Sequence, residues 1–194
     1  MRIPAQRILA LPVAALGAVA LTGLVAGTAG ASTVTSGSVT LTVNASFLTA
    51  LAQHGVAFVP KDYSSISYAG GEVAVTFAAT SGNADISTFS GTIAYSGGIC
   101  GFDLKSGKSI ELGSLLFDLG DTQFDGQGSA AAGEVPLVDL AGTQSGDIVG
   151  TTETYSASDL VLDAAGASYL NGALGTKAFS SGEDVGSFGA TWVI

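Results

Sequence analysis

Residues 39–43 read Val-Thr-Leu-Thr-Val, and this strict alternation of apolar and polar side chains predicts a strand with one buried face. The same period of two recurs in residues 72–80, 149–155 and 188–194, with Glu153 out of step in the second of these. Residues 109–119 begin with the same alternation and become apolar on both faces near Leu115. Gly-rich stretches separate the runs, and glycine supplies the positive φ of tight turns. Short strands with frequent turns indicate a β-sandwich or barrel, and we expect an immunoglobulin-like antiparallel β-sandwich.

Two short segments follow a helical period instead. In the first, Asn44 is a candidate N-cap and Gly55 a stop, and in the second Asp163 and Gly175 have the same roles. The apolar faces would be formed by Phe47, Leu48 and Leu51 in the first segment and by Tyr169, Leu170 and Ala173 in the second. We therefore expect an all-β domain with two short helices.

The two helical segments also resemble each other. Residues 39–58 and 160–179 share a Ser-aromatic-Leu triplet, a later Leu, a Gly and an Ala-Phe pair, with one residue of slippage. This internal similarity predicts a strand–helix–strand unit used near each end of the domain. Each helix would either close an open end of the sandwich or present a group to a ligand, and the sequence leaves both interpretations open.

The first 31 residues have the features of a signal peptide. Arg2 and Arg7 precede an uncharged, mostly apolar run at residues 8–25, and Ala29-Gly30-Ala31 matches a cleavage site that would leave Ser32 first. The run is long enough for an uncleaved membrane anchor, but Pro12 and the small residues before Ser32 favour cleavage. We expect residues 32–194 to form one secreted, extracellular domain without a membrane span, released freely because no wall-sorting motif follows.

The charge balance is strongly acidic. The chain has 6 Lys or Arg against 16 Asp or Glu, and Arg2 and Arg7 would leave with the signal peptide. This balance argues against nucleic acids and anionic membranes as partners, because both are bound through basic residues. We expect the partner to be an unidentified envelope or extracellular component. Cys100 is the only cysteine, so no intramolecular disulfide can form, and we interpret it as a small buried apolar side chain rather than a reactive thiol.

Motifs for catalysis and for structural metals are missing from the sequence. There is no Gly-x-Ser-x-Gly elbow, phosphate loop or His-Glu-x-x-His helix, and one His and one Cys do not make a zinc site. Asp118, Asp121 and Asp125 lie around two glycines and could hold calcium, although solvated turn acids explain them more simply. A pair among the 16 acids could hydrolyse glycosides, which keeps a carboxylate-dependent glycoside hydrolase as one alternative. We expect no enzyme and no metal site.

Several short motifs together resemble a known family. They are Ser46-Phe47 in the first helix, the strand–turn at residues 91–98, Phe102-Asp103-Leu104 with the return strand Ile110-Glu111-Leu112, and Tyr169-Leu170-Asn171 followed by Phe179, Gly182, Val185 and Gly186. With this set the chain resembles the HtaA-type domain of secreted and wall-attached haem-uptake proteins of Gram-positive bacteria. The resemblance covers most of residues 32–194, and it implies a ligand-binding domain with haem as its cofactor.

The haem ligands of that family do not carry over to this sequence. In the family a tyrosine on the early helix ligates haem iron and a histidine in the glycine turn supports it. By the resemblance these positions fall on Ala50 and at about Gly98, so both groups are absent. The remaining candidate haem ligands are Tyr63, Tyr68, Tyr169 and His54, although a helix-terminal role explains His54 more simply.

We therefore expect a secreted, non-catalytic, HtaA-like binding or surface-interaction protein without a cofactor. The alternative is a protein that binds or transfers haem through a ligand other than that of the family.

Overall fold

The computed structural model describes residues 32–129 and 133–194, and within them the chain forms eleven strands and two helices. The predicted signal peptide, residues 1–31, lies outside the described residues. The first elements are β1 (Ser36–Val43), α1 (Ala45–His54), β2 (Val56–Lys61), β3 (Ser65–Ala69), β4 (Glu72–Gly82), β5 (Thr92–Tyr95) and β6 (Gly98–Asp103). They are followed by β7 (Ser109–Asp118), β8 (Gln123–Gly128), β9 (Glu134–Val149), β10 (Thr152–Leu162), α2 (Ala164–Leu174) and β11 (Asp184–Val193).

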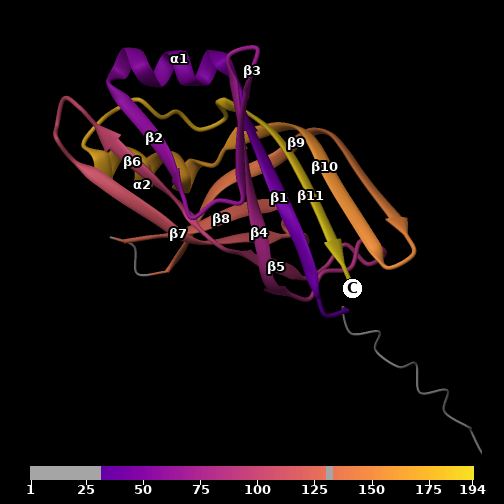
Figure 1. Ribbon diagram of the computed structural model, residues 1–194. Coiled ribbons are helices and arrows are strands. Elements are labelled where there is room, and N and C mark those ends of the chain that lie inside the picture. The colour runs from indigo at the N-terminus through magenta and orange to yellow at the C-terminus, as the bar shows by residue number, and fades with distance from the viewer. Residues whose placement is uncertain (1–31, 130–132) are drawn as a thin grey trace, which may run out of the picture.

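The strands form one antiparallel sheet that closes on itself (Figure 1). Its order is β2-β6-β7-β5-β4-β1-β11-β10-β9-β8, and a further pairing of β7 with β8 joins eight of these strands into a barrel. β2 and β6 extend the sheet beyond β7, and β3 pairs with β4 outside this path. The predicted all-β antiparallel class with two helices is confirmed. The immunoglobulin-like sandwich is not, because the β7–β8 pairing makes one continuous closed sheet where a sandwich has two separate ones.

The alternation seen in the sequence sets the register of the central strands. Val39 of β1 lies opposite Phe77 of β4 on one side and Ala190 of β11 on the other, and all three side chains are buried. Because side chains alternate across a sheet, the matched runs place one face of each strand inside the barrel. A slip of one residue would expose the whole apolar set.

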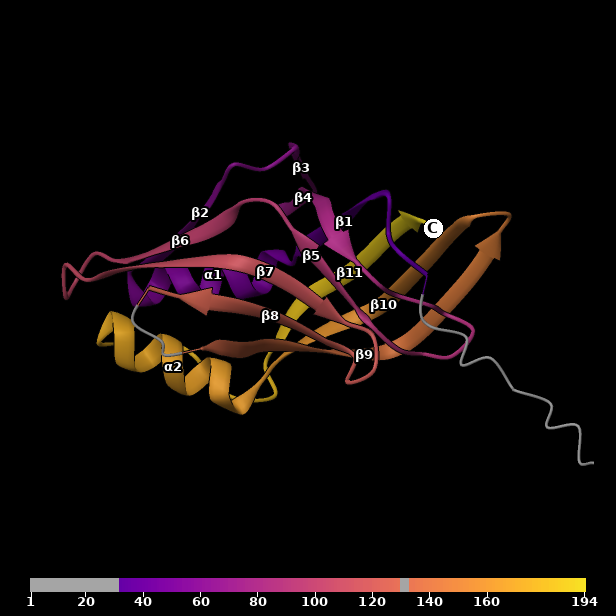
Figure 2. The ribbon, with the colours of Figure 1, turned by 90° about the horizontal axis from the view of Figure 1, so that it is seen from below.

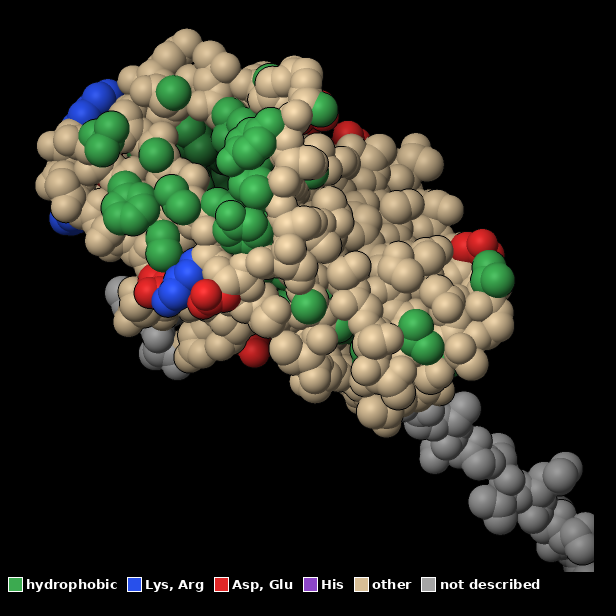
Figure 3. Space-filling view, in the orientation of Figure 1, with side chains coloured by type: hydrophobic (Ala, Val, Ile, Leu, Met, Phe, Trp, Pro, Cys, Tyr) green, Lys and Arg blue, Asp and Glu red, His purple; other side chains and the backbone are tan. Residues whose placement is uncertain are grey.

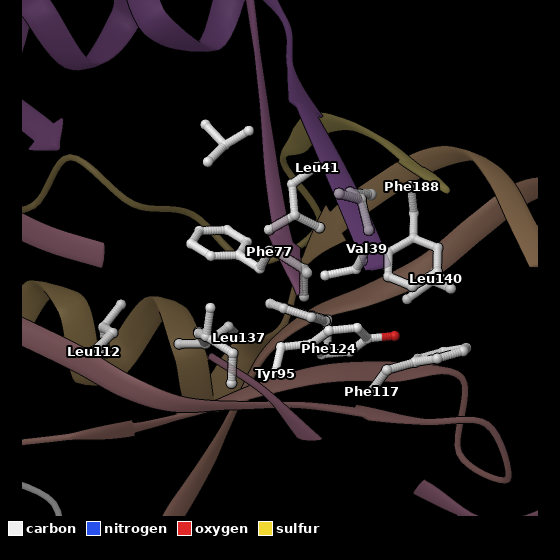
Figure 4. Packing of buried hydrophobic residues seen from close by; sticks show 14 of the residues in the cluster. Val39, Leu41, Phe77, Tyr95, Leu112, Phe117, Phe124, Leu137, Leu140 and Phe188 are labelled. Carbon is white, nitrogen blue, oxygen red and sulfur yellow. The ribbon is translucent and has the colours of Figure 1, made fainter. Parts of the chain in front are cut away.

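Aromatic rings fill the centre of the barrel (Figure 4). The ring of Phe117 from β7 lies 4.7 Å from Phe188 and 5.7 Å from Tyr155, measured between centroids, and 6.4 Å from Trp192. Phe124 reaches Phe188 from the other side at 6.1 Å. Offset and edge-to-face arrangements of this kind are favourable and leave few voids. Strands from both ends of the sequence are thereby held by one core.

A β-bulge explains the stretch of β7 that is apolar on both faces. Ile110 and Leu112 point inward, then the register shifts between Gly113 and Leu116, and Leu115 and Phe117 point inward instead. Ser114, between them, has a φ of 48°, a left-handed conformation that is uncommon outside glycine. The bulge changes which residues of the strand face inward and bends β7 where its partner on one edge changes from β6 to β5, while β8 stays paired along the other edge.

Both helices begin and end as predicted. The Asn44 side chain accepts a hydrogen bond from the Phe47 amide at 2.7 Å, and Asp163 accepts one from the Ala165 amide at 2.6 Å. Gly55 and Gly175 end the helices with φ of 81° and 69°. A polar N-cap satisfies free amides, and glycine takes the left-handed C-cap without strain. No helix in the described part of the chain is both long and apolar enough to cross a membrane.

The two helices lie at the same end of the barrel (Figure 2). α1 follows the end of β1, where Val43 pairs with Gly186, and α2 follows the end of β10, where Val161 pairs with Asp184. Both helices therefore follow strand ends that pair with the first residues of β11. The predicted strand–helix–strand unit is present at β1, α1 and β2. In the second copy, an irregular segment at residues 175–183 separates α2 from β11. Along the sequence one helix lies near each end of the domain, as expected. In space both helices lie at the same end of the barrel, because β1 and β10 both run antiparallel to β11 and therefore leave the sheet at the same end.

The segment at residues 83–91 packs against the opposite end of the barrel. Ala84 and Ile86 are buried, and the ring of Phe89 packs edge-on against Tyr155. The Ile86 amide donates a 3.0 Å hydrogen bond to Oε2 of Glu153, which is only 2% exposed. Glu153, the residue that broke the apolar pattern of its strand, thus points inward and fixes this segment.

Replacing Glu153 should loosen this end of the barrel. Glu153→Ala leaves the buried Ile86 amide without an acceptor, and we expect a loss of about 1–3 kcal/mol in the free energy of unfolding. Glu153→Gln keeps an oxygen acceptor and should lose less. Urea unfolding followed by circular dichroism measures both, with the outward-facing Thr154→Ala as a control. Equal stability of Glu153→Ala and the wild type would refute the role of this hydrogen bond.

A buried carboxyl in β8 makes stability depend on pH. Asp125 is 9% exposed, and its Oδ1 has no hydrogen-bond partner within the described structure. Burial, together with the nearby charges of Glu134 and Asp118, raises its pKa to about 6. A raised carboxyl pKa means that the folded protein binds the proton more tightly than the unfolded chain.

The contribution of Asp125 to stability should therefore decrease as the pH rises from about 4 to about 6, and remain constant above that. Thermal unfolding of the wild type and Asp125→Asn across this range provides the measurement. The difference between the two proteins isolates this carboxyl from the others. A difference that does not change with pH would contradict the assignment.

Candidate functional site

An apolar groove of about 170 Å³ opens on the surface beside α1. Phe58 and Pro60 of β2 form one wall, and Ile66 and Tyr68 of β3 form another. Apolar side chains of β1, β4, β6 and α1 complete the lining, and no charged residue takes part. Figure 3 shows hydrophobic side chains gathered in this hollow, whereas the surface over β1, β10 and β11 is mostly neither hydrophobic nor charged. The groove is thus a concave apolar site, and further hydrophobic side chains are exposed beside it on the same face.

The groove exists because β2 and β3 do not pair with each other. β2 pairs with β6 and β3 pairs with β4, so the free edges of the two strands border the site. Pro60 fits an edge strand because it has no amide hydrogen to donate. Exposed edges and exposed apolar surface are both unusual in a folded monomer. Their coincidence here makes the groove the candidate functional site.

Of the four sequence-predicted site residues, only Tyr68 lines this groove. It lies on β3 with 73% of its surface exposed. Tyr63 lies in the connection between β2 and β3 and is 42% exposed, outside the groove lining. His54 is the last residue of α1 and is exposed, in agreement with a helix-terminal position. These residues do not converge on one point with Tyr169.

Tyr169 is turned into the protein rather than toward a ligand. Its hydroxyl is buried with no hydrogen-bond partner in the described structure, and it lies against Gly128 of β8. A Cβ atom built at Gly128 would be only 1.8 Å from the Tyr169 oxygen, so the strand can accommodate this ring only with a glycine there. The tyrosine therefore packs α2 onto the barrel.

The glycine turn before β6 has no room for a side chain. A Cβ at Gly98 would lie 2.4 Å from the Leu112 carbonyl oxygen, and one at Gly97 would lie 2.6 Å from that of Lys61. Gly97 also has a φ of 90°. The position to which the resemblance assigns a histidine, at about Gly98, is therefore closed by backbone, and a histidine substituted there alone would not fit. Ala50, the position to which the resemblance assigns a tyrosine, lies in the middle of α1.

The acidic residues do not form a metal site. In the described ranges there is no cluster of three or more His, Cys, Asp or Glu side chains that could hold a metal ion. Oδ1 of Asp118 instead accepts backbone hydrogen bonds from Gly120 at 2.8 Å and Asp121 at 3.1 Å, as turn acids do. The buried Asp125 is poorly placed to reach a polysaccharide. Cys100 is a free, half-buried thiol on β6.

Sequence patterns alone missed most of the groove. Phe58, Pro60 and Ile66 line it, yet none is a chemically reactive type of residue. A signal was present, because Ile66 and Tyr68 alternate with serines in the short strand β3. Such a pattern indicates which face of β3 is apolar. It does not reveal that β3 and β2 stay unpaired and leave a groove between them.

Comparison with solved structures identifies the architecture. The C-terminal domain of HtaA from Corynebacterium glutamicum has a TM-score of 0.60 with this chain at 14% sequence identity, and the match covers 83% of this chain and 98% of that domain. A domain-swapped dimer of a variant of the same domain has a TM-score of 0.52 at 12% identity, covering 77% of this chain and 92% of that one. No family model and no curated protein matches the sequence. The chain therefore has the fold of an HtaA-type domain.

Proposed function

We propose that this chain is an exported, non-catalytic binding protein that holds a small apolar ligand in the groove between β2 and β3. The observation that carries the proposal is the lining of the groove, in which Tyr68 supplies the one polar group. Ligand sites in proteins are typically concave, mainly apolar and provided with a few polar groups. A binding role is also supported by the absence of a carboxylate, histidine, serine or cysteine from this lining, since general acid–base and nucleophilic catalysis need such groups.

Export is part of the same proposal. It is supported by the signal-like pattern of residues 1–31 and by the likeness of the fold to a domain of HtaA. The ligand or partner would then come from the cell envelope or the extracellular medium.

Haem is the second candidate ligand, and one observation favours it. Tyr68 places a phenol at the groove, and tyrosinate is a known ligand of ferric haem. The family's own haem site does not fit, because Ala50 offers no ligand and backbone fills the space next to Gly98. The groove is also smaller than the roughly 300–1,000 Å³ of typical ligand pockets. Haem would therefore need β2 and β3 to move apart and Tyr68 to act in place of the family tyrosine.

Binding of a neutral apolar dye tests the main proposal. N-phenyl-1-naphthylamine should bind the purified protein in a one-to-one complex and gain fluorescence. Ile66→Glu places a charge in the groove and should weaken this binding at least about ten-fold, because a charge is costly to bury beside an apolar ligand. Val149→Glu is the matched control, since Val149 is 70% exposed and lies outside the groove. No binding, or equal loss in both variants, would refute the proposal.

A hemin titration tests the second candidate. If haem binds at this groove, the Soret band should shift on mixing, and Tyr68→Phe should abolish the absorption features of a tyrosinate-ligated ferric haem. Tyr63→Phe should leave them unchanged, because Tyr63 is outside the groove lining. A wild-type protein that binds the dye without shifting the Soret band would remove haem and leave the apolar-ligand proposal in place.

A further inference from the structure

A second apolar cavity, of about 130 Å³, adjoins the groove at the helical end of the barrel, and we call it the inner cavity because most of its lining residues are buried. It is lined only by apolar side chains, among them Phe47 of α1, Leu170 of α2 and Phe179. It therefore sits at the end of the barrel where both helices pack. An apolar space of this size suits small apolar guests, as an engineered cavity of about 150 Å³ does with benzene.

The cavity and the groove share three lining residues, Leu41, Phe58 and Ile99. Phe58 is the one among them that lies on the edge strand β2, and it is half-buried. Its ring meets Phe179 edge-on at a centroid distance of 5.9 Å. The ring also occupies the space above Gly101 of β6, where a Cβ atom would lie 2.6 Å from Cε1. One side chain on an edge strand thus forms a wall of both spaces.

We propose that the groove and the inner cavity are two sections of one binding channel, divided by the ring of Phe58. The ligand that this channel fits is a single-chain amphiphile whose head group is not anionic. The inference rests on the proposed function, and it adds the class of ligand and the residue that controls how deeply the ligand enters.

The lining of the two sections selects this ligand. Only hydrocarbon can enter the inner cavity without losing hydrogen bonds, because no polar side chain lines it. A chain, unlike a large ring system, can pass a single displaced side chain. A polar head would remain at the mouth beside Tyr68. Lys61, the lysine of β2, is paired with Glu111 at 2.7 Å. The chain as a whole is acidic, so the charge around the groove does not favour an anionic head group.

Methyl NMR of the wild-type protein with primary alcohols provides the test. Val73 lines only the groove, and Leu170 lines only the inner cavity. Butanol should shift the methyl signals of Val73 alone, whereas decanol should shift those of both residues. Decanol that saturates the Val73 shift and leaves Leu170 unchanged would overturn the channel while the proposed function stands. Alcohols that shift neither residue would overturn the proposed function itself.

A substitution at the divider completes the experiment. Phe58→Trp should block the passage, so that decanol loses its effect on Leu170 while butanol still shifts Val73. A persistent Leu170 shift in this variant would overturn the role of Phe58 as the divider. Thermal unfolding checks that the variant is folded, and the wild-type measurement remains decisive if it is not.

Discussion

The structure depends on the pairing of β7 with β8, which closes eight strands into a barrel. Closure removes most free strand edges, and those that remain border the candidate site, because β2 and β3 lie outside the ring. The bulge at Ser114 allows the barrel to close, because it lets β7 pair with β6 and β5 along one edge and with β8 along the other. The groove therefore forms where β2 and β3, which are not part of the closed ring of strands, stay unpaired with each other.

Both ends of the barrel must be covered, and the chain uses different means for each. The helices cover one end and leave an apolar space between them, whereas the segment at residues 83–91 closes the other through the Glu153 hydrogen bond. Every cavity that we connect with a ligand lies at the helical end. The polar anchor lies at the opposite end, where it adds rigidity without facing the candidate site.

The fold of an HtaA-type domain is combined here with a glycine turn that has no room for a side chain. Two close backbone contacts, at Gly97 and Gly98, exclude a side chain from the turn, and Tyr169 is committed to packing against Gly128. What remains beside the groove is a single exposed phenol on a short edge strand. This set of groups is consistent with the proposed retention of an apolar molecule in the groove.

The sequence by itself determined the local features of this protein. Alternation in residues 39–43 and 188–194 gave strands with one buried face, and Asn44, Asp163, Gly55 and Gly175 set the limits of both helices, because these signals act within a few residues. Only the tertiary structure decided that the sheet closes, that both helices share one end, and that β2 and β3 stay apart. Those outcomes depend on contacts such as Phe117 with Trp192, between residues far apart in the chain, whose pairing no local pattern encodes.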